Sequence, residues 1–345
     1  MRAPILYTVL VLLHFSAAQY ASYASNAELL DRVSALDCSM RVQVDLIHDL
    51  YPSLRPDFNL TRIILHDHPE GVYPTHRFLV VCGLGALDLV AQEVCMSLME
   101  RLCNGTSALG GDAIAAFVLV PNPVGRARAL AQYASVLADP TFSYEAGRYN
   151  GSLSAEQLCD DSTRRGVDID RNFPSVGDDQ RHPLGYSLLG RSYLPFSEVE
   201  ARIVSYVVSI VRPTTLFKLE TGDYYGAAMP LDRGHSVLSP PLEASKAALQ
   251  AALAPLMPDS ASVYAYGADA RRSGPKAGTL GDWAFDAMDV PRVASFSVYD
   301  YAGAFASVGA PCIFRRVPFR GAQLSAAVGR WVPTVFAAFS AAESL

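Results

Sequence analysis

The chain has 345 residues, half of them hydrophobic, and a formal net charge of −6 from 28 basic and 34 acidic side chains. This length and apolar content are sufficient for one large hydrophobic core or two smaller ones. Because no run of Lys or Arg is long enough to follow a phosphate backbone, the composition argues against a nucleic-acid partner.

The N-terminus has the pattern of a secretory signal peptide. Arg2 precedes an apolar run over residues 5–15, and the small residues Ser16-Ala-Ala18 offer a cleavage site after position 18. The run is too short to span a bilayer, and no later stretch is long enough to do so. We therefore expect residues 1–18 to be removed and residues 19–345 to form one secreted domain, with a buried N-terminal helix as the alternative.

Short apolar runs alternate with helical patterns along the first half of the chain. Residues 77–82 and 114–120 are continuous apolar runs of the kind found in strands buried on both faces. Between them, apolar residues recur at helical spacing over residues 89–102. Asn104-Gly105 follows this helix with residues that tolerate a left-handed cap.

The alternation continues to the C-terminus. Ser197 and Glu200 form a predicted capping box for a helix that runs to Arg212. The later strands are expected at residues 215–219 and 293–299, and the later helices at residues 244–254 and 322–341. Strands that alternate with crossover helices predict a three-layer α/β/α domain with a mostly parallel mixed sheet. The long polar segment over residues 139–191 is expected to frame a site.

The cysteine content supports an extracellular location. An even number of cysteines is typical of an oxidising compartment, where they pair. Fifteen complete pairings are possible, so the sequence assigns none, and the absence of C-x-x-C spacing argues against a structural zinc site. The six cysteines are Cys38, Cys82, Cys95, Cys103, Cys159 and Cys312. Candidate glycosylation sites are Asn59, Asn104 and Asn150.

One segment is especially informative. Gly166-Val-Asp-Ile-Asp-Arg-Asn-Phe-Pro174, followed by Pro195-Phe-Ser-Glu-Val-Glu200, resembles the substrate-binding segment and next helix start of the zinc metallocarboxypeptidases, the carboxypeptidase A family. Further landmarks occur in the family's order, at His68-Pro-Glu-Gly71, Asn122-Pro-Val-Gly125, Gly147-Arg-Tyr-Asn150 and Asp282-Trp283. The resemblance covers roughly residues 66–319 and implies a carboxypeptidase-like fold.

The same resemblance implies that the zinc ligands are replaced. The family holds zinc with two His and one Glu, and the resemblance places Gly85 and Thr221 at the His positions and Asp88 at the Glu position. Glycine has no side chain to ligate, and a threonine hydroxyl is a poor zinc ligand. Asp88 fits better as an acid in the first turn of a helix, where the dipole favours it. At the general-base position, spacing places Val298, with Asp300 as the nearest carboxylate.

The family's residues that bind the terminal carboxylate of the substrate have closer matches in this chain than its zinc ligands do. Arg171 and Arg148 match the family's two arginines, whose forked donors suit a carboxylate. Asp170 replaces an Asn, however, and an ionised Asp repels a carboxylate. An alternative is that these three residues form an internal ion-pair network. Asp168 matches the Asp that orients the first zinc His in the family.

These observations predict a degenerate, non-catalytic carboxypeptidase-fold protein with no expected cofactor. It would be secreted and would bind a peptide or protein C-terminus through the former active-site cleft at Arg148, Asp170 and Arg171. The main alternative is an active zinc carboxypeptidase that recruits Asp88, Glu220, Asp223 or a nearby His. A third hypothesis is a purely structural secreted domain.

Overall fold

The computed structural model describes residues 20–38, 41–46, 61–66, 74–104, 109, 112–144, 146–163, 166–174, 194–221, 226–229, 240–255, 263–265, 279–299 and 311–343. Eight strands in these ranges form one mixed sheet with the order β1-β2-β4-β3-β5-β8-β6-β7. The strands are β1 (Arg41–Leu46), β2 (Thr61–His66), β3 (His76–Cys82), β4 (Ala113–Val118), β5 (Thr215–Glu220), β6 (Gly226–Met229), β7 (Val263–Ala265) and β8 (Arg292–Ser297).

The centre of the sheet is parallel and its edges are mixed. Strands β4, β3, β5 and β8 pair in parallel, as do β6 and β7, whereas the β1–β2, β2–β4 and β6–β8 pairs are antiparallel. The central strands are buried on both faces, as parallel strands usually are. The predicted mostly parallel mixed sheet is therefore confirmed.

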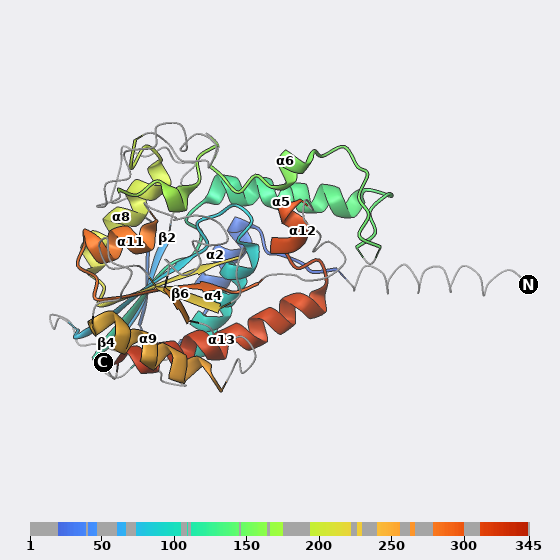
Figure 1. Ribbon diagram of the computed structural model, residues 1–345. Helices are drawn as coiled ribbons and strands as arrows, with labels where there is room; N and C mark the ends of the chain where they lie inside the picture. Colours follow the sequence, from blue (N-terminus) through green and yellow to red (C-terminus); the bar gives the residue numbers. More distant parts are fainter. Residues whose placement is uncertain are drawn as a thin grey trace, which may run out of the picture.

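Helices cover both faces of this sheet. In Figure 1, α9 and α13 lie along one side and α8 and α11 along the other. Two separate clusters of buried apolar side chains lie between the sheet and these helices, one on each face. The helices are α2 (Asn26–Ser34), α4 (Leu89–Cys103), α5 (Pro123–Ala138), α6 (Ala155–Leu158), the 3-10 turn η1 (Ile169–Arg171), α8 (Val199–Val211), α9 (Pro240–Leu253), α11 (Leu280–Asp286), α12 (Cys312–Arg316) and α13 (Gly321–Glu343). This is the predicted three-layer α/β/α architecture.

The start of α8 differs from the prediction. Glu198, and not Ser197, is the N-cap residue, and no capping box with Glu200 forms. Instead, the Asn172 side chain accepts the Glu198 backbone N–H at 2.9 Å and donates to the Ser197 hydroxyl at 2.9 Å. The segment that ends η1 therefore fixes the start of α8, which links the predicted substrate-binding segment rigidly to the sheet.

The C-terminal end of α4 also differs in detail. Asn104 is the C-cap residue, but its φ of −75° is not left-handed. Gly105 lies outside the described residues. At the end of α8, Arg212 adopts the left-handed conformation with a φ of 46°, and its N–H donates to Val208.

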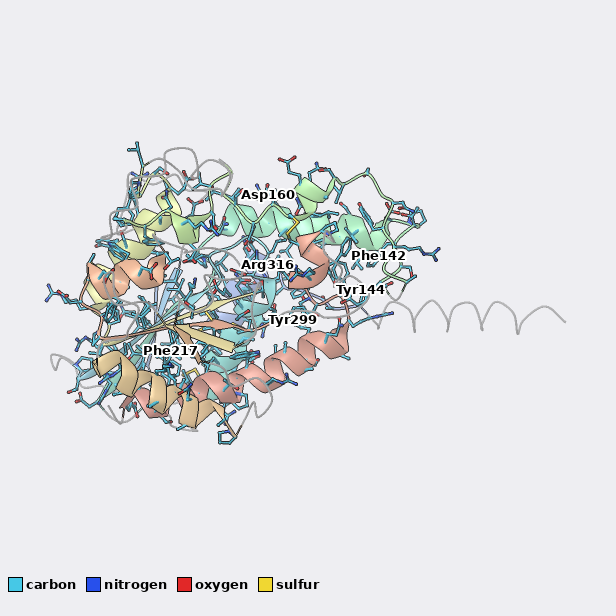
Figure 2. All side chains as sticks on the ribbon, in the orientation of Figure 1. Phe142, Tyr144, Asp160, Phe217, Tyr299 and Arg316 are labelled. Carbon is cyan, nitrogen blue, oxygen red and sulfur yellow. A yellow bond between two sulfur atoms is a disulfide. The ribbon has the colours of Figure 1, made fainter. Side chains whose placement is uncertain are left out.

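All six cysteines are paired. The bonds are Cys38–Cys103, Cys82–Cys95 and Cys159–Cys312. The third bond joins positions 153 residues apart and ties the segment after α6 to the start of α12; it is drawn in yellow near Asp160 in Figure 2. Among the described helices, none is both long and apolar enough to cross a membrane.

We predict that the double variant Cys159→Ser/Cys312→Ser loses about 2–5 kcal/mol of unfolding free energy, because the bond closes a long loop and restricts the unfolded chain. Urea unfolding of the oxidised protein measures this loss. The matched control is Cys38→Ser/Cys103→Ser, which removes a bond across 65 residues on a different part of the fold. Peptide mapping without reduction that links Cys159 to any other cysteine would contradict the assignment.

Candidate functional site

The three positions that the family resemblance assigns to zinc ligands lie together at the carboxyl ends of the parallel strands. Gly85 and Asp88 follow β3, and Thr221 follows β5. All three line one cavity of about 90 Å³. In open α/β sheets, ligands bind at this end of the strands. The cavity is therefore the candidate functional site.

Asp88 is buried and its carboxylate is fully engaged. It is the residue before α4 and is 2% exposed. It accepts hydrogen bonds at 2.8 Å from the Gly85 N–H, the Thr221 N–H and the Thr221 hydroxyl. A fourth donor is Nη2 of Arg316, at 3.0 Å. Asp88 thus joins the segment after β3 to the end of β5.

Gly85 provides space for a second acid. A Cβ built at this position would lie less than 3.0 Å from the carboxylate of Asp161. That carboxylate is held in place, because it accepts the Leu87 N–H at 2.8 Å and pairs with Nη1 of Arg316. No side chain fits at position 85 unless Asp161 moves.

A guanidinium lies among these groups. Arg316 donates from Nε and Nη2 to the Thr221 carbonyl, at 3.0 and 2.6 Å, and its two terminal nitrogens contact Asp161 and Asp88. It is carried by α12 (Figure 2). The neighbouring Phe314 is buried there among aromatic rings, including Phe142, whose ring stacks on it at 5.9 Å between centroids. Packing and the bond at Cys312 therefore position this cation.

The substrate-binding residues predicted from the sequence are only partly brought together. Asp170 and Arg171 line the cavity. Arg148 is exposed, pairs through its backbone with Ser143, and does not line the cavity. Arg171 lies 3.4 Å from Asp168. The predicted ion-pair network therefore exists for Asp170 and Arg171, but with other partners and without Arg148.

The partner of Asp170 is a buried lysine that the sequence did not single out. Lys218 is 1% exposed, and its ammonium lies 2.6 Å from Asp170 and 2.8 Å from Glu220. Asp170 also accepts the N–H of Leu280, at the start of α11, at 3.2 Å. Since residues two apart on a strand share a face, Lys218 and Glu220 both face the cavity side of β5. The two-residue spacing of Lys218 and Glu220 was the sequence signal that could have identified this pair.

Val298, which spacing indicated as the general-base position, does not line the cavity. Val298 is buried in the core cluster with Phe296, on the opposite face of the sheet. Ser297 lines the cavity and is fully buried, and its hydroxyl has no hydrogen-bond partner within the described part of the chain. A slip of one residue reverses the face of a strand residue. Asp300 and Asp223 lie outside the described residues.

Comparison with solved structures places this architecture among known folds. Bovine thrombin-activatable fibrinolysis inhibitor, in complex with tick carboxypeptidase inhibitor, is 13% identical over 94% of this chain and 98% of that chain, with a TM-score of 0.59. A second structure of thrombin-activatable fibrinolysis inhibitor is 14% identical over 94% and 75%, with a TM-score of 0.62. Carboxypeptidase A from Helicoverpa armigera is 13% identical over 94% and 74%, with a TM-score of 0.59. The chain has the metallocarboxypeptidase fold.

Likeness at this level of identity concerns the fold alone. No protein-family model and no curated protein sequence matches the chain. The chemistry of the cavity therefore has to be derived from its own residues.

The cavity residues do not fit the zinc ion that the metallocarboxypeptidase fold implies. A catalytic zinc needs three protein ligands and an open position for water. Of the three positions that the family resemblance assigns to zinc ligands, Gly85 offers no ligand and Asp88 already accepts four hydrogen bonds. Across the described ranges, no three His, Cys, Asp or Glu side chains are grouped to hold a metal. The guanidinium of Arg316 would also repel a divalent cation placed between Asp88 and Asp161.

Burial and mutual repulsion raise the pKa values of acids that line the cavity. Burial raises the pKa of Asp88 to about 7, and Arg316 opposes this rise. The pKa of Asp161 is raised in the same way, and again Arg316 opposes the rise. Burial, followed by the charge of Asp170, raises the pKa of Asp168 to about 6. Each raised pKa favours the neutral carboxyl, so these three acids lose their protons less readily than exposed aspartates.

We predict that Arg316→Met destabilises the protein by about 3–5 kcal/mol at pH 8, because it leaves the buried Asp88 and the partly buried Asp161 without their cation. Without Arg316, the folded-state pKa of each carboxyl is higher than in the wild type. Since the unfolded-state values are unchanged, the difference in stability grows as pH rises from 5 to 8. Urea unfolding at several pH values measures this, with Arg315→Met as the neighbouring control. A difference that is independent of pH would contradict the assignment.

We predict that Gly85→Ala costs about 1–3 kcal/mol, because the new Cβ displaces the Asp161 carboxylate from Leu87 and Arg316. The matched control is Gly329→Ala in α13, where a Cβ meets open space. That change is expected to be neutral or to stabilise the helix by about 0.5–1 kcal/mol. Thermal unfolding compares the two. Equal effects would show that position 85 has no special requirement for glycine.

Proposed function

We propose that this chain is a secreted, non-hydrolytic protein of the metallocarboxypeptidase fold that binds a peptide or a protein C-terminus at the former active-site cavity. The observation that carries the proposal is the position of Arg316, whose guanidinium contacts Asp88, Asp161 and Thr221. A guanidinium stays protonated, has no open coordination position and cannot generate a metal-bound hydroxide. Hydrolysis by the family's route then has neither its Lewis acid nor its activated water.

Two features support binding of a peptide or protein. Arg171 lies in the cavity wall, where its forked donors suit a terminal carboxylate. The bovine protein of the same fold is in complex with a carboxypeptidase inhibitor from tick, so the fold presents a surface to which another protein binds. An extracellular location is supported by three disulfides and by the signal-like N-terminus.

The rival hypothesis, an active zinc carboxypeptidase, would have to recruit other ligands. Asp88 is saturated with donors, and Glu220 lies 2.8 Å from the ammonium of Lys218. Asp223 lies outside the described residues. We expect the purified protein to contain no stoichiometric zinc and to release no C-terminal amino acid from unblocked peptides. Metal analysis and a hydrolysis assay test this together; one equivalent of zinc with chelator-sensitive release would establish the rival.

Binding is tested with short N-acetylated peptides that have either a free C-terminal carboxylate or the corresponding amide. We expect the free carboxylates to bind more tightly, and Arg171→Gln to weaken that preference roughly 10- to 100-fold, the value of a hydrogen bond to a charged group. Arg171→Lys, which keeps the charge but loses the fork, is expected to recover part of it. Calorimetry or fluorescence anisotropy measures both.

Arg148→Gln tests whether the second predicted arginine contributes to binding of the carboxylate. Arg148 does not line the cavity. The matched control is Arg202→Gln, which removes an exposed arginine from α8. Equal affinity for carboxylate and amide peptides in the wild type would reject C-terminus recognition and favour the purely structural hypothesis.

A further inference from the structure

The segment between α5 and α6, residues 139–154, lies largely at the surface and outside the cavity. Within it, Ser143 and Arg148 pair as an antiparallel bridge with two backbone hydrogen bonds of 2.8 and 3.0 Å. In Figure 1 the segment lies at the end of α5, at the right of the view. None of its described residues lines the cavity at the ends of the strands. The contacts that form the cavity therefore do not account for this segment.

Asn150 has a fixed backbone and an exposed side chain. Its N–H donates to the Thr141 hydroxyl at 3.2 Å, and that hydroxyl donates to Asp139 at 2.6 Å. Asn150 and Ser152 are both exposed and belong to neither a helix nor a strand. Over the described ranges, no hydrogen bond engages the carboxamide of Asn150 or the hydroxyl of Ser152. Both groups are therefore available to an enzyme that approaches from solvent.

These two residues are the ends of an Asn-Gly-Ser tripeptide. An asparagine followed two residues later by serine or threonine, with a residue other than proline between them, is the acceptor for an N-linked glycan in secreted proteins. The glycan is bulky and needs a surface position. Of the three candidate tripeptides, that at Asn150 lies wholly within the described residues, whereas Asn59 and the two residues after Asn104 lie outside them.

The middle residue of the tripeptide has no room for a side chain. A Cβ built on Gly151 would lie less than 3.0 Å from the Asp139 carboxylate and from the Tyr149 ring. The Tyr149 hydroxyl also accepts the Leu153 N–H at 3.3 Å, which fixes the ring beside the tripeptide. The two ends of the tripeptide are exposed instead. Either end can therefore be substituted without disturbing the packing at Gly151.

We propose that Asn150 carries an N-linked glycan. The amide nitrogen of Asn150 forms a bond to the anomeric carbon of an oligosaccharide, the bond between that carbon and the diphosphate of a lipid-linked donor breaks, and the nitrogen loses one proton. The donor and its transferase belong to the secretory pathway, so this proposal rests on the secreted location given in the proposed function. It goes beyond that function, because it assigns a modification to a surface outside the cavity.

The test uses the full chain, recovered from the medium of a secreting animal cell line and treated with a peptide N-glycosidase in heavy-oxygen water. This enzyme converts a glycosylated asparagine to an aspartate that carries one heavy oxygen. Trypsin separates the candidate sites, because it cleaves after Arg101 and after Arg148. We expect mass spectrometry to find heavy aspartate at position 150, in the peptide that begins at Tyr149. An unmodified Asn150 in the secreted protein would overturn the proposal.

Two variants remove the acceptor tripeptide from opposite ends. Asn150→Gln and Ser152→Ala are each expected to lose one glycan, seen as the same step to higher mobility in gel electrophoresis. Ser152→Thr is the matched control, because it keeps the tripeptide and is expected to retain the wild-type mobility. After treatment with the glycosidase, all four proteins are expected to run together. A step seen with Asn150→Gln but not with Ser152→Ala would overturn the proposal, as would a step with neither.

These outcomes are independent of peptide binding. A glycan at Asn150, together with equal affinity for carboxylate and amide peptides, would support this proposal and reject C-terminus recognition. A preference for carboxylate peptides with a bare Asn150 would do the reverse. Retention of the chain inside the cell, with Asn150 bare, would reject the secreted location and the glycan together.

Discussion

The contact of the Arg316 guanidinium with Asp88, Asp161 and Thr221 is the interaction on which the rest of the site depends. It joins the segment after β3, the segment after α6 and the end of β5, which are far apart in the sequence. A buried carboxylate and a partly buried one that share this cavity repel each other unless a cation lies between them. In this chain the Arg316 side chain supplies that cation.

A bound metal ion combines two roles, and a guanidinium can supply only one of them. A bound ion holds its ligands together, and it also activates water through an open coordination position. The guanidinium performs only the first role, since its donors are directed at fixed acceptors and its charge is permanent. Likeness of fold does not establish an activity, so the function has to be derived from the residues of the site.

Much of the fold followed from local pattern, because apolar runs and helical spacing are properties of short segments. The strands at β3, β4, β5 and β8 and the helices α4, α9 and α13 lie where the pattern predicted them, with small differences at their ends. The predictions were wrong or incomplete where a residue distant in the sequence determines the local structure. Asn172, 26 residues earlier in the chain, fixes Glu198 at the start of α8, and Arg316 reaches Asp88 across 228 residues. At Val298 and Ser297, spacing alone could not determine which residue faces the cavity.

The charged groups of the cavity and the space around them fit one another. Gly85 leaves space that Asp161 fills, and Asp161 pairs with Arg316. The acid at position 170 would repel Glu220 if Lys218 did not lie between them. Buried charges left unpaired would cost several kcal/mol each. Compensation at two separate ion clusters therefore holds the ends of β3 and β5 to the segments packed around them.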